Sequence, residues 1–219
     1  YLDFVQDAER CKTLGFEGLG SIAFDTLGDL IKAIPSFLKM GAWRSIYALV
    51  AKHFSNDKLR TVMSFHPLLI GGNPFSVTAA YALINSLERT WGVHSAMGGT
   101  GAIVKAMVGL LDSRGIQLRL NAPVTQIRIE NGKACGVELA SGEFIAADIV
   151  VSNADTAWTY KNLVAPQHRR HWTNRKIENG RYSMGLFVWY FGTSKQYHDV
   201  PHHMMVLGPR YKGLLTDIF

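Results

Sequence analysis

The sequence predicts a mixed α/β (α+β) fold in which one sheet region interrupts a mostly helical chain. Two observations lead to this fold class. Apolar residues recur at spacings of three and four within residues 1–95, as they do along one face of a helix. After Trp91 the period shortens, and three short apolar runs are separated by turns at Asn131-Gly132 and Ser141-Gly142, which is typical of antiparallel strands.

The composition is that of a globular protein. Of the 219 residues, 47% are hydrophobic and 18% are charged, which argues against a disordered chain. The formal net charge of +6 suits an anionic membrane surface, a nucleic acid or an acidic ligand, and it equally suits a solvated surface without a partner. Cys11 and Cys135 form no CxxC pair, which argues against a disulfide framework or a zinc site and fits a reducing cytosol. No apolar run reaches the roughly 18 residues of a spanning helix.

Residues 1–95 are predicted to form several helices, separated by proline and glycine residues. One helix is predicted to begin near Leu27, and Pro35 should kink or end it because proline lacks a backbone donor. A break is predicted at Gly71-Gly72-Asn73-Pro74. Further helices are predicted at residues 43–54, 57–70 and 76–90.

The second half begins with a glycine-rich stretch, Gly98-Gly99-Thr100-Gly101, which is predicted to open a helix. Strands are then predicted from Val124 and from Cys135, followed by a third from Phe144 to Ser152. The third ends in the apolar run Ile149-Val150-Val151, which favours a buried strand. Residues 156–180 are expected to be helical or irregular, and an aromatic strand is predicted at residues 183–191.

Six stretches occur in the order typical of one family. Together they resemble the bacterial-type phytoene desaturases, which are carotenoid desaturases of the flavin amine oxidase superfamily. No single stretch is decisive, but the ordered set spans nearly the whole chain. The matching stretches are Ala42–Tyr47, Phe65–Phe75, Leu87–Val93, Gly98–Ala102, Val151–Asp155 and Gly208–Tyr211.

This resemblance implies a Rossmann-like FAD-binding domain, built from separated segments, with an inserted helical and sheet substrate domain. It assigns residues 1–95 to a substrate and membrane-associated domain, 96–155 to the FAD-binding domain, and 156–219 to the substrate domain again. The family's GxGxxG motif is absent, and Gly15–Gly20 has the wrong spacing and no preceding strand. We therefore expect both ends of the chain to be cut points and the chain to be an internal fragment.

The resemblance also suggests cofactor-binding residues. Asn121–Ile127 is similar to a superfamily segment in which a valine backbone contacts the adenine of FAD, so Val124 would bind through its N–H and C=O. Asn153, Ala154 and Asp155 follow a predicted buried strand, at the end where ligands gather in open α/β sheets. The alternatives stay open: Val124 as an ordinary strand residue, and Asp155 as a helix N-cap.

A catalytic acid or base is harder to find. Asp29 resembles an acidic site of the family's substrate domain, and an aspartate in a dry pocket could have its pKa raised; the alternative is a solvated acid on an amphipathic helix. His66 is a second candidate, with a core histidine as the alternative. The histidines near residues 168–171 and 198–203 lack a convincing third ligand, so no metal site is expected. The apolar residues proposed to line a substrate tunnel, or else to form ordinary core, are Leu68, Leu69, Ile70, Phe75, Phe187, Trp189 and Phe191.

The implied activity is FAD-dependent desaturation of a linear C40 polyene, most simply phytoene, by hydride transfer to the flavin. The alternatives are a related desaturase, isomerase, ketolase or retinol-saturase-like enzyme, and a non-catalytic lipid-binding relative. The expected location is peripheral, on the cytoplasmic side of a membrane, where residues 27–43 could dock as an amphipathic segment or instead pack on the protein core. No nucleic-acid module accompanies the basic run at residues 168–172, and the sequence leaves the oligomeric state open.

Overall fold

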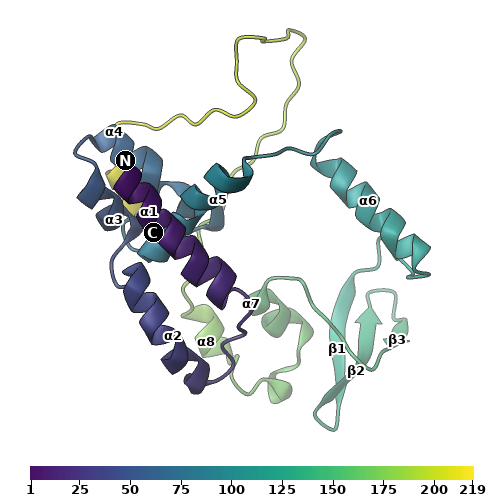
Figure 1. Ribbon diagram of the computed structural model, residues 1–219. Helices are drawn as coiled ribbons and strands as arrows, with labels where there is room; N and C mark the ends of the chain where they lie inside the picture. Colours follow the sequence, from purple (N-terminus) through teal and green to yellow (C-terminus); the bar gives the residue numbers. More distant parts are fainter. The chain divides into compact units, whose positions relative to one another are not determined.

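The computed structural model describes all residues from Tyr1 to Phe219, and these form two compact units (Figure 1). The first unit joins Tyr1–His94 to Ser183–Phe219, and the second is Ser95–Tyr182. No helix combines the length and hydropathy needed to cross a bilayer. Each unit is described separately below.

The first unit is helical. Its core gathers around α1 (Leu2–Cys11), whose Phe4 is 1% exposed and packs edge-on against Phe54 at 5.5 Å between ring centroids. His53 Nε2 lies 2.9 Å from Asp7 Oδ2 and so ties α3 to α1. The remaining elements are the π-helical segment Lys12–Leu19, α2 (Leu27–Met40), α3 (Ile46–His53), α4 (Asp57–Ser64), the 3-10 turns His66–Ile70 and Ala79–Ala82, α5 (Leu83–Trp91) and α9 (Tyr211–Ile218).

Helix α2 differs from its prediction because it continues through Pro35 to Met40. Pro35 lies on the exposed side of the helix, where water can reach the carbonyl of Ile31 that loses its donor. The helix ends instead at Gly41, whose φ of 68° allows the Ala42 N–H to donate to the Phe37 carbonyl. At the other end, Thr26 and Asp29 form a reciprocal capping box.

Two other helix predictions need adjustment. The helix expected at residues 57–70 ends at Ser64 and gives way to a 3-10 turn, because Pro67 cannot continue the α-helical hydrogen bonding. The helix expected at residues 76–90 begins as a 3-10 turn at Ala79 and becomes α5 at Leu83. The Gly15–Gly20 stretch lies on helical backbone.

The second unit contains a three-stranded antiparallel sheet in the order β1-β2-β3. Its hairpin turn at Asn131-Gly132 has positive φ at both residues, as a two-residue turn requires. The strands are β1 (Val124–Glu130), β2 (Lys133–Leu139) and β3 (Phe144–Ala146), and the helices are α6 (Thr100–Ser113), α7 (Thr156–Trp158), the π-helical segment Thr159–Leu163, the 3-10 turn Pro166–His168 and α8 (Asn174–Glu178).

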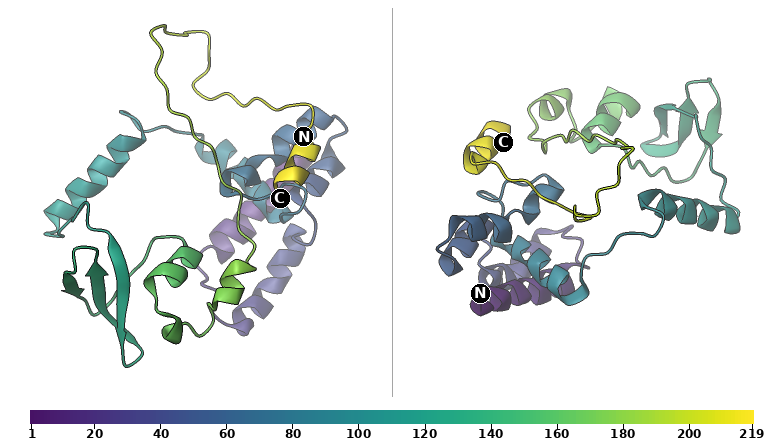
Figure 2. Two further views of the ribbon diagram at one scale, coloured as in Figure 1. Left: turned by 180° about the vertical axis from the view of Figure 1, so that it is seen from behind. Right: turned by 90° about the horizontal axis from the view of Figure 1, so that it is seen from above.

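One predicted strand is shorter than expected, and another is not formed. Strand β3 stops at Ala146, and Ile149 and Val151 are 80% and 86% exposed rather than buried. The aromatic run at residues 183–191 is also neither helix nor strand, and Figure 2 draws it as a plain trace. The physical reason is the same in both places: no strand within residues 1–219 pairs with either run.

The compact units also divide the chain differently from the predicted domains. The prediction grouped residues 156–182 with the C-terminal segment, whereas the structure packs them on the sheet. Leu163 and Val164 join Ile127 of β1 in one buried cluster, which holds this segment in the second unit. The assignment of the units to a substrate domain and an FAD-binding domain stays a prediction.

Leu49→Ala is expected to destabilise the first unit by about 3 kcal/mol, because Leu49 is 2% exposed and its loss leaves a cavity. Leu2→Ala is the matched control: the same change at a side chain 70% exposed should cost less than about 0.5 kcal/mol. Hydrogen exchange of the α3 amides reports the stability of this unit alone. Equal effects of the two substitutions would show that the core is not centred on α1 and α3.

Candidate functional site

The second unit holds most of the predicted site residues on or beside one face of its sheet. Ile127 is 9% exposed, and Leu163 and Val164 are each 7% exposed where they pack against it. Val124 and Val150 pack partly buried at the margin of the same cluster. The start of β1 and the segment after β3 therefore pack against the same apolar cluster.

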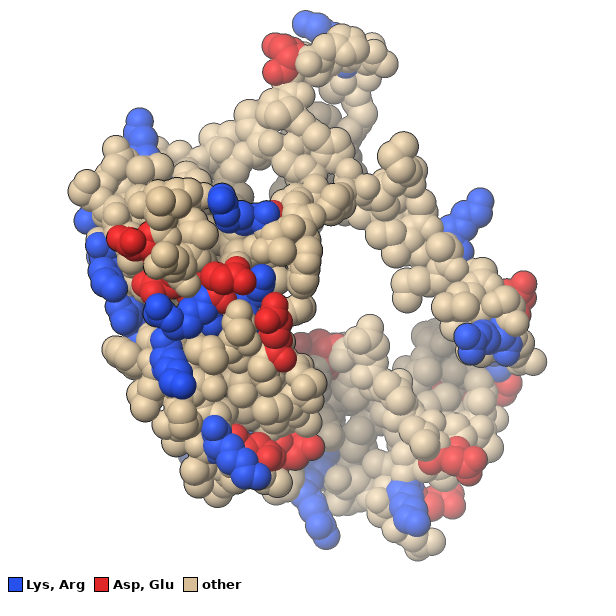
Figure 3. Space-filling model, viewed as in Figure 1, with Lys and Arg blue, Asp and Glu red and all other residues tan.

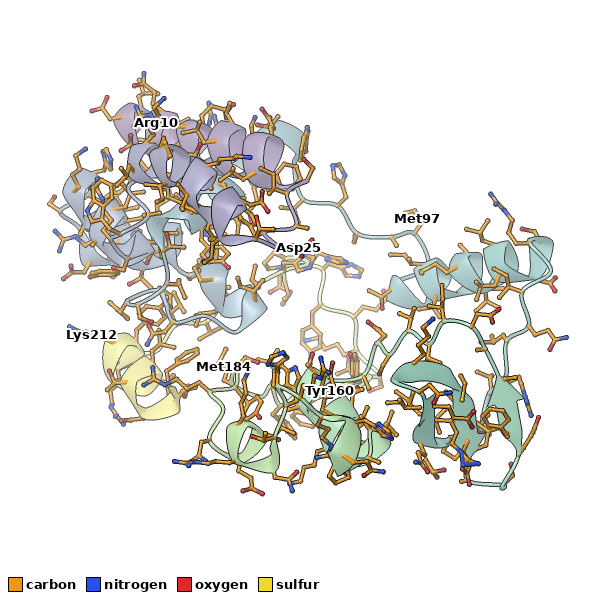
Figure 4. All side chains as sticks on the ribbon, turned by 90° about the horizontal axis from the view of Figure 1, so that it is seen from below. Arg10, Asp25, Met97, Tyr160, Met184 and Lys212 are labelled. Carbon is orange, nitrogen blue, oxygen red and sulfur yellow. The ribbon has the colours of Figure 1, made fainter.

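A cavity of about 500 Å³ adjoins this cluster. Apolar side chains of β1 and β2 line part of it, and hydroxyl groups and one imidazole from residues 152–168 line the rest. Tyr160, labelled in Figure 4, comes from the π-helical segment after α7. The lining residues are Ile127, Ile129, Ala134, Val150, Ser152, Ala154, Thr156, Thr159, Tyr160, Val164 and His168. A lining that combines apolar side chains with a few polar groups is typical of a small-molecule site.

Ala154 is the predicted residue that lines this cavity, and hydrogen bonds fix its surroundings. The hydroxyls of Ser152 and Thr159 lie 2.8 Å apart, and Thr159 is only 8% exposed. The Thr159 hydroxyl also lies 3.5 Å from the Ala154 carbonyl oxygen. Ala154 was a candidate from the sequence. Ser152, Thr159 and Tyr160 were not predicted to line a site, because no motif marks these residues.

Asp155 caps a helix in this structure. Its Oδ1 accepts a hydrogen bond of 2.9 Å from the Trp158 N–H, and its carbonyl accepts one of 2.8 Å from the Thr159 N–H. The N-cap alternative left open by the sequence is therefore realised here. Asn153 and Asp155 are both exposed. A role of either residue toward a cofactor stays a prediction.

Val124 begins an edge strand. Strand β1 pairs with β2 on one side, and no strand within residues 1–219 pairs with its other side. The Ala140 N–H donates to the Pro123 carbonyl at 2.9 Å, which fixes the chain just before Val124. A free strand edge presents main-chain donors and acceptors, and these are the groups that an adenine ring would require. The adenine contact that the resemblance implies for Val124 stays a prediction.

Asp29 belongs to the first unit, at the start of α2. Its Oδ2 accepts hydrogen bonds from the Thr26 hydroxyl at 2.7 Å and from the Thr26 N–H at 3.2 Å. The Asp29 N–H in turn donates to Thr26 Oγ1 at 3.2 Å. Asp29 therefore stabilises the N-terminus of α2, and its proposed part in proton transfer stays a prediction.

His66 is a buried histidine with one partner. Its side chain is 4% exposed, and Nε2 lies 3.1 Å from Glu88 Oε2, while Nδ1 has no partner. His66 was a candidate from the sequence, whereas its partner Glu88, 22 residues further along the chain, was not predicted.

Cys11 is a buried residue of the first unit. Its burial raises the pKa of its thiol to about 11.

The remaining candidates are dispersed. His202 Nδ1 and His203 Nδ1 lie 2.9 Å apart, and no group of three metal-ligating side chains forms in residues 1–219. Of the proposed tunnel residues, Phe75 packs against Tyr47 and Tyr211. Leu69, Ile70, Phe187, Trp189 and Phe191 are exposed, and Leu68 is half-buried.

Similar proteins agree on one family. The chain is 47% identical over its whole length to the neurosporene-forming phytoene desaturase of Cereibacter sphaeroides, and 46% identical over 99% of its length to that of Rhodobacter capsulatus. It is 41% identical over its whole length to the lycopene-forming phytoene desaturase of Paracoccus sp.. The chain spans 43%, 42% and 44% of these relatives, less than half of each.

The family comparison covers most of the chain. Residues 28–213 match the family of flavin containing amine oxidoreductases. The matched region includes α2, the sheet, the cavity beside it and α8. The chain therefore belongs to the flavin containing amine oxidoreductase family.

Proposed function

We propose that the protein to which this chain belongs is an FAD-dependent enzyme that introduces double bonds into a linear C40 polyene, with phytoene as substrate. The observation that carries this proposal is the identity of 47% over the whole chain to a phytoene desaturase. The likeness extends through both compact units and is not confined to a cofactor motif. This breadth favours a shared substrate class as well as a shared cofactor.

The second unit is the part of the chain that we propose to hold a flavin dinucleotide. Val124, at the start of an edge strand, would hold the adenine through main-chain groups, and Asn153, Ala154 and Asp155 would lie along the cofactor beside the cavity. When bound, FAD supplies the hydride acceptor for the desaturation. The apolar side chains of Ile127 and Ile129, which line the cavity, would exclude water from a cofactor bound there.

The substrate imposes a different requirement. A C40 hydrocarbon has no polar group, so its binding free energy must come from buried apolar area. The chain has many exposed apolar side chains, including Phe187, Trp189 and Phe191. Such residues supply that area, and they support the proposal of a polyene partner held at a membrane. The cytoplasmic side of that membrane is proposed from the family resemblance alone.

The complete protein, incubated with FAD and with phytoene in liposomes, is expected to develop visible absorption bands as conjugation lengthens. The band positions separate a neurosporene-type from a lycopene-type product, because longer conjugation absorbs at longer wavelength. Omission of FAD is the control and should abolish the bands. Bound flavin without new bands would exclude phytoene as the substrate, and lack of flavin binding would contradict the proposed cofactor.

Two substitutions separate the proposed proton-transfer role of Asp29 from its capping role. Asp29→Asn keeps an acceptor for the Thr26 N–H but cannot take up a proton, so desaturation should fall about 100-fold or more. Thr26→Ala should lower the free energy of unfolding by about 1 kcal/mol, with little effect on turnover per folded molecule. Full turnover in Asp29→Asn, measured with phytoene, would leave Asp29 only its capping role.

Main-chain recognition of adenine at Val124 predicts an unusual pattern of substitutions. Val124→Ala should change the Kd for FAD by less than about twofold, since the side chain is replaceable. Val124→Pro should weaken binding about tenfold, because proline removes the N–H donor while remaining tolerated at the first residue of an edge strand. Quenching of flavin fluorescence by the complete protein measures both values. Equal affinities of the two variants would argue against this contact.

A further inference from the structure

The segment that follows the sheet carries an excess of positive charge. Residues 156–182 contain six Lys or Arg residues and a single acidic residue, Glu178. None of the six cations forms a salt bridge within residues 1–219. Figure 3, by contrast, shows blue and red side chains next to each other over the helices of the first unit, where Arg10 pairs with Asp7 at 2.8 Å. The cations of residues 156–182 therefore lack the counter-charges that other parts of the chain have.

A cavity of about 720 Å³ brings three of these cations together on α8 and the residues after it. This volume is within the range of small-molecule sites, roughly 300–1,000 Å³. Neither Glu178 nor any other acidic residue lines the cavity. A ligand in it would meet three positive charges and no negative one. The lining residues that matter here are Trp172, Arg175, Lys176, Asn179, Arg181 and Tyr182.

Hydrogen bonds hold the backbone around this cavity at both ends of α8. The Arg169 guanidinium donates to the Val164 carbonyl at 2.6 Å and to Asn174 Oδ1 at 2.7 Å. Val164 belongs to the buried cluster on the sheet, so the start of α8 is tied to that cluster. At the other end, the Tyr182 hydroxyl donates to the carbonyl of Ile177, which is 6% exposed. A ligand therefore finds the backbone already in place, which lowers the entropic cost of binding.

An aromatic pair positions one of the three cations. The rings of Trp172 and Tyr160, the latter labelled in Figure 4, stack with centroids 5.4 Å apart and planes 12° apart. Lys176 Nζ lies 4.8 Å from the centroid of the Trp172 ring. This cation–π contact restricts a side chain that would otherwise lose much rotamer freedom when a ligand binds. Tyr160 lines the cavity beside the sheet, but no residue lines both cavities, so they are separate sites.

The charges of the lining residues indicate the class of ligand. A guanidinium group donates paired hydrogen bonds that match phosphate oxygens, and an ammonium group adds a point charge. A ligand with one carboxylate would leave two of the three cations without a partner, whereas a diphosphate can engage all three. A nucleic acid is a poorer match, because it is bound along an extended basic surface and these cations converge on one cavity.

We propose that this cavity is a binding site for a soluble small molecule that carries a diphosphate group, and that the site is separate from the one for FAD. Arg175 and Arg181 bind the phosphate oxygens, and Lys176 supplies the third charge. The proposal goes beyond the desaturase function and requires neither flavin nor polyene. Val124 and residues 153–155, on which the proposed FAD site depends, do not line this cavity.

Calorimetric titration of the complete protein with inorganic diphosphate, at low ionic strength, tests the proposal. One diphosphate should bind per chain, and Arg175→Gln with Arg181→Gln should raise its Kd about tenfold or more, because each substitution removes a charge-assisted contact. Arg114→Gln with Lys133→Gln is the matched control. It removes the same charge from two exposed residues of the same unit that do not line the cavity, and it should bind like the wild type.

Tryptophan fluorescence gives a second measurement. Diphosphate should change the emission of the wild-type protein, because Trp172 lines the cavity and contacts Lys176. Trp172→Phe keeps an aromatic ring beside the lysine and should abolish the change in emission while the calorimetric Kd rises less than about threefold.

Four results would overturn the proposal. The first is the absence of diphosphate binding, and the second is an equal loss of binding in the cavity variant and the control variant. The third is binding of phosphatidylglycerol vesicles or of an oligonucleotide, but not of diphosphate, that depends on Arg175 and Arg181. The fourth is competition between diphosphate and FAD, with the cavity variant weakened for both. A protein that binds diphosphate in this cavity but does not desaturate phytoene would contradict the proposed function and leave this site standing.

Discussion

A β-strand forms only where a second strand accepts and supplies its hydrogen bonds, and this requirement governs the second unit. The hairpin of β1 and β2 satisfies it locally through two turn residues with positive φ, and β3 adds to it after a second turn. The equally apolar run at residues 149–151 lacks a partner strand, and its Ile149 and Val151 stay exposed. The same rule leaves the outer edge of β1 free, and that free edge is the feature that makes main-chain recognition at Val124 possible.

The first unit follows a different rule, because a helix satisfies its own backbone and needs a partner only for its apolar face. Phe4, Ile46 and Val50 bury that face completely in the core around α1. Helix α2 contributes Met40 to the same core and also buries Ala33, while Leu27, Ile31, Ile34 and Leu38 stay exposed. Helix α2 is thus divided between a side that packs on the core and a side that keeps its apolar residues exposed.

The candidate site combines residues that serve structure and residues free for binding. Asp29 and Asp155 both use their carboxylates to cap helices, which accounts for aspartate at these positions without reference to catalysis. Ala154 lines the cavity, and the proposed adenine contact of Val124 uses its main-chain groups. The identity of these two side chains therefore says little about cofactor binding. The proposed site therefore consists mainly of a strand edge, apolar side chains and hydroxyl groups rather than a cluster of charged side chains.

Most of the local elements, and the family, could be predicted from sequence patterns. Helical spacing, the Asn131-Gly132 turn and the glycines before α6 are short-range signals, and the structure realises each of them. Other features could not be predicted from the sequence. These are the burial of particular apolar runs, the continuation of α2 past Pro35, the packing of residues 156–182 on the sheet and the contact between His66 and Glu88. The reason is physical: capping and turns depend on neighbours within a few residues, whereas burial and strand pairing depend on partners that sequence patterns do not name. The strand predicted at residues 183–191 was wrong on this account, since its residues have the right side chains and no partner strand.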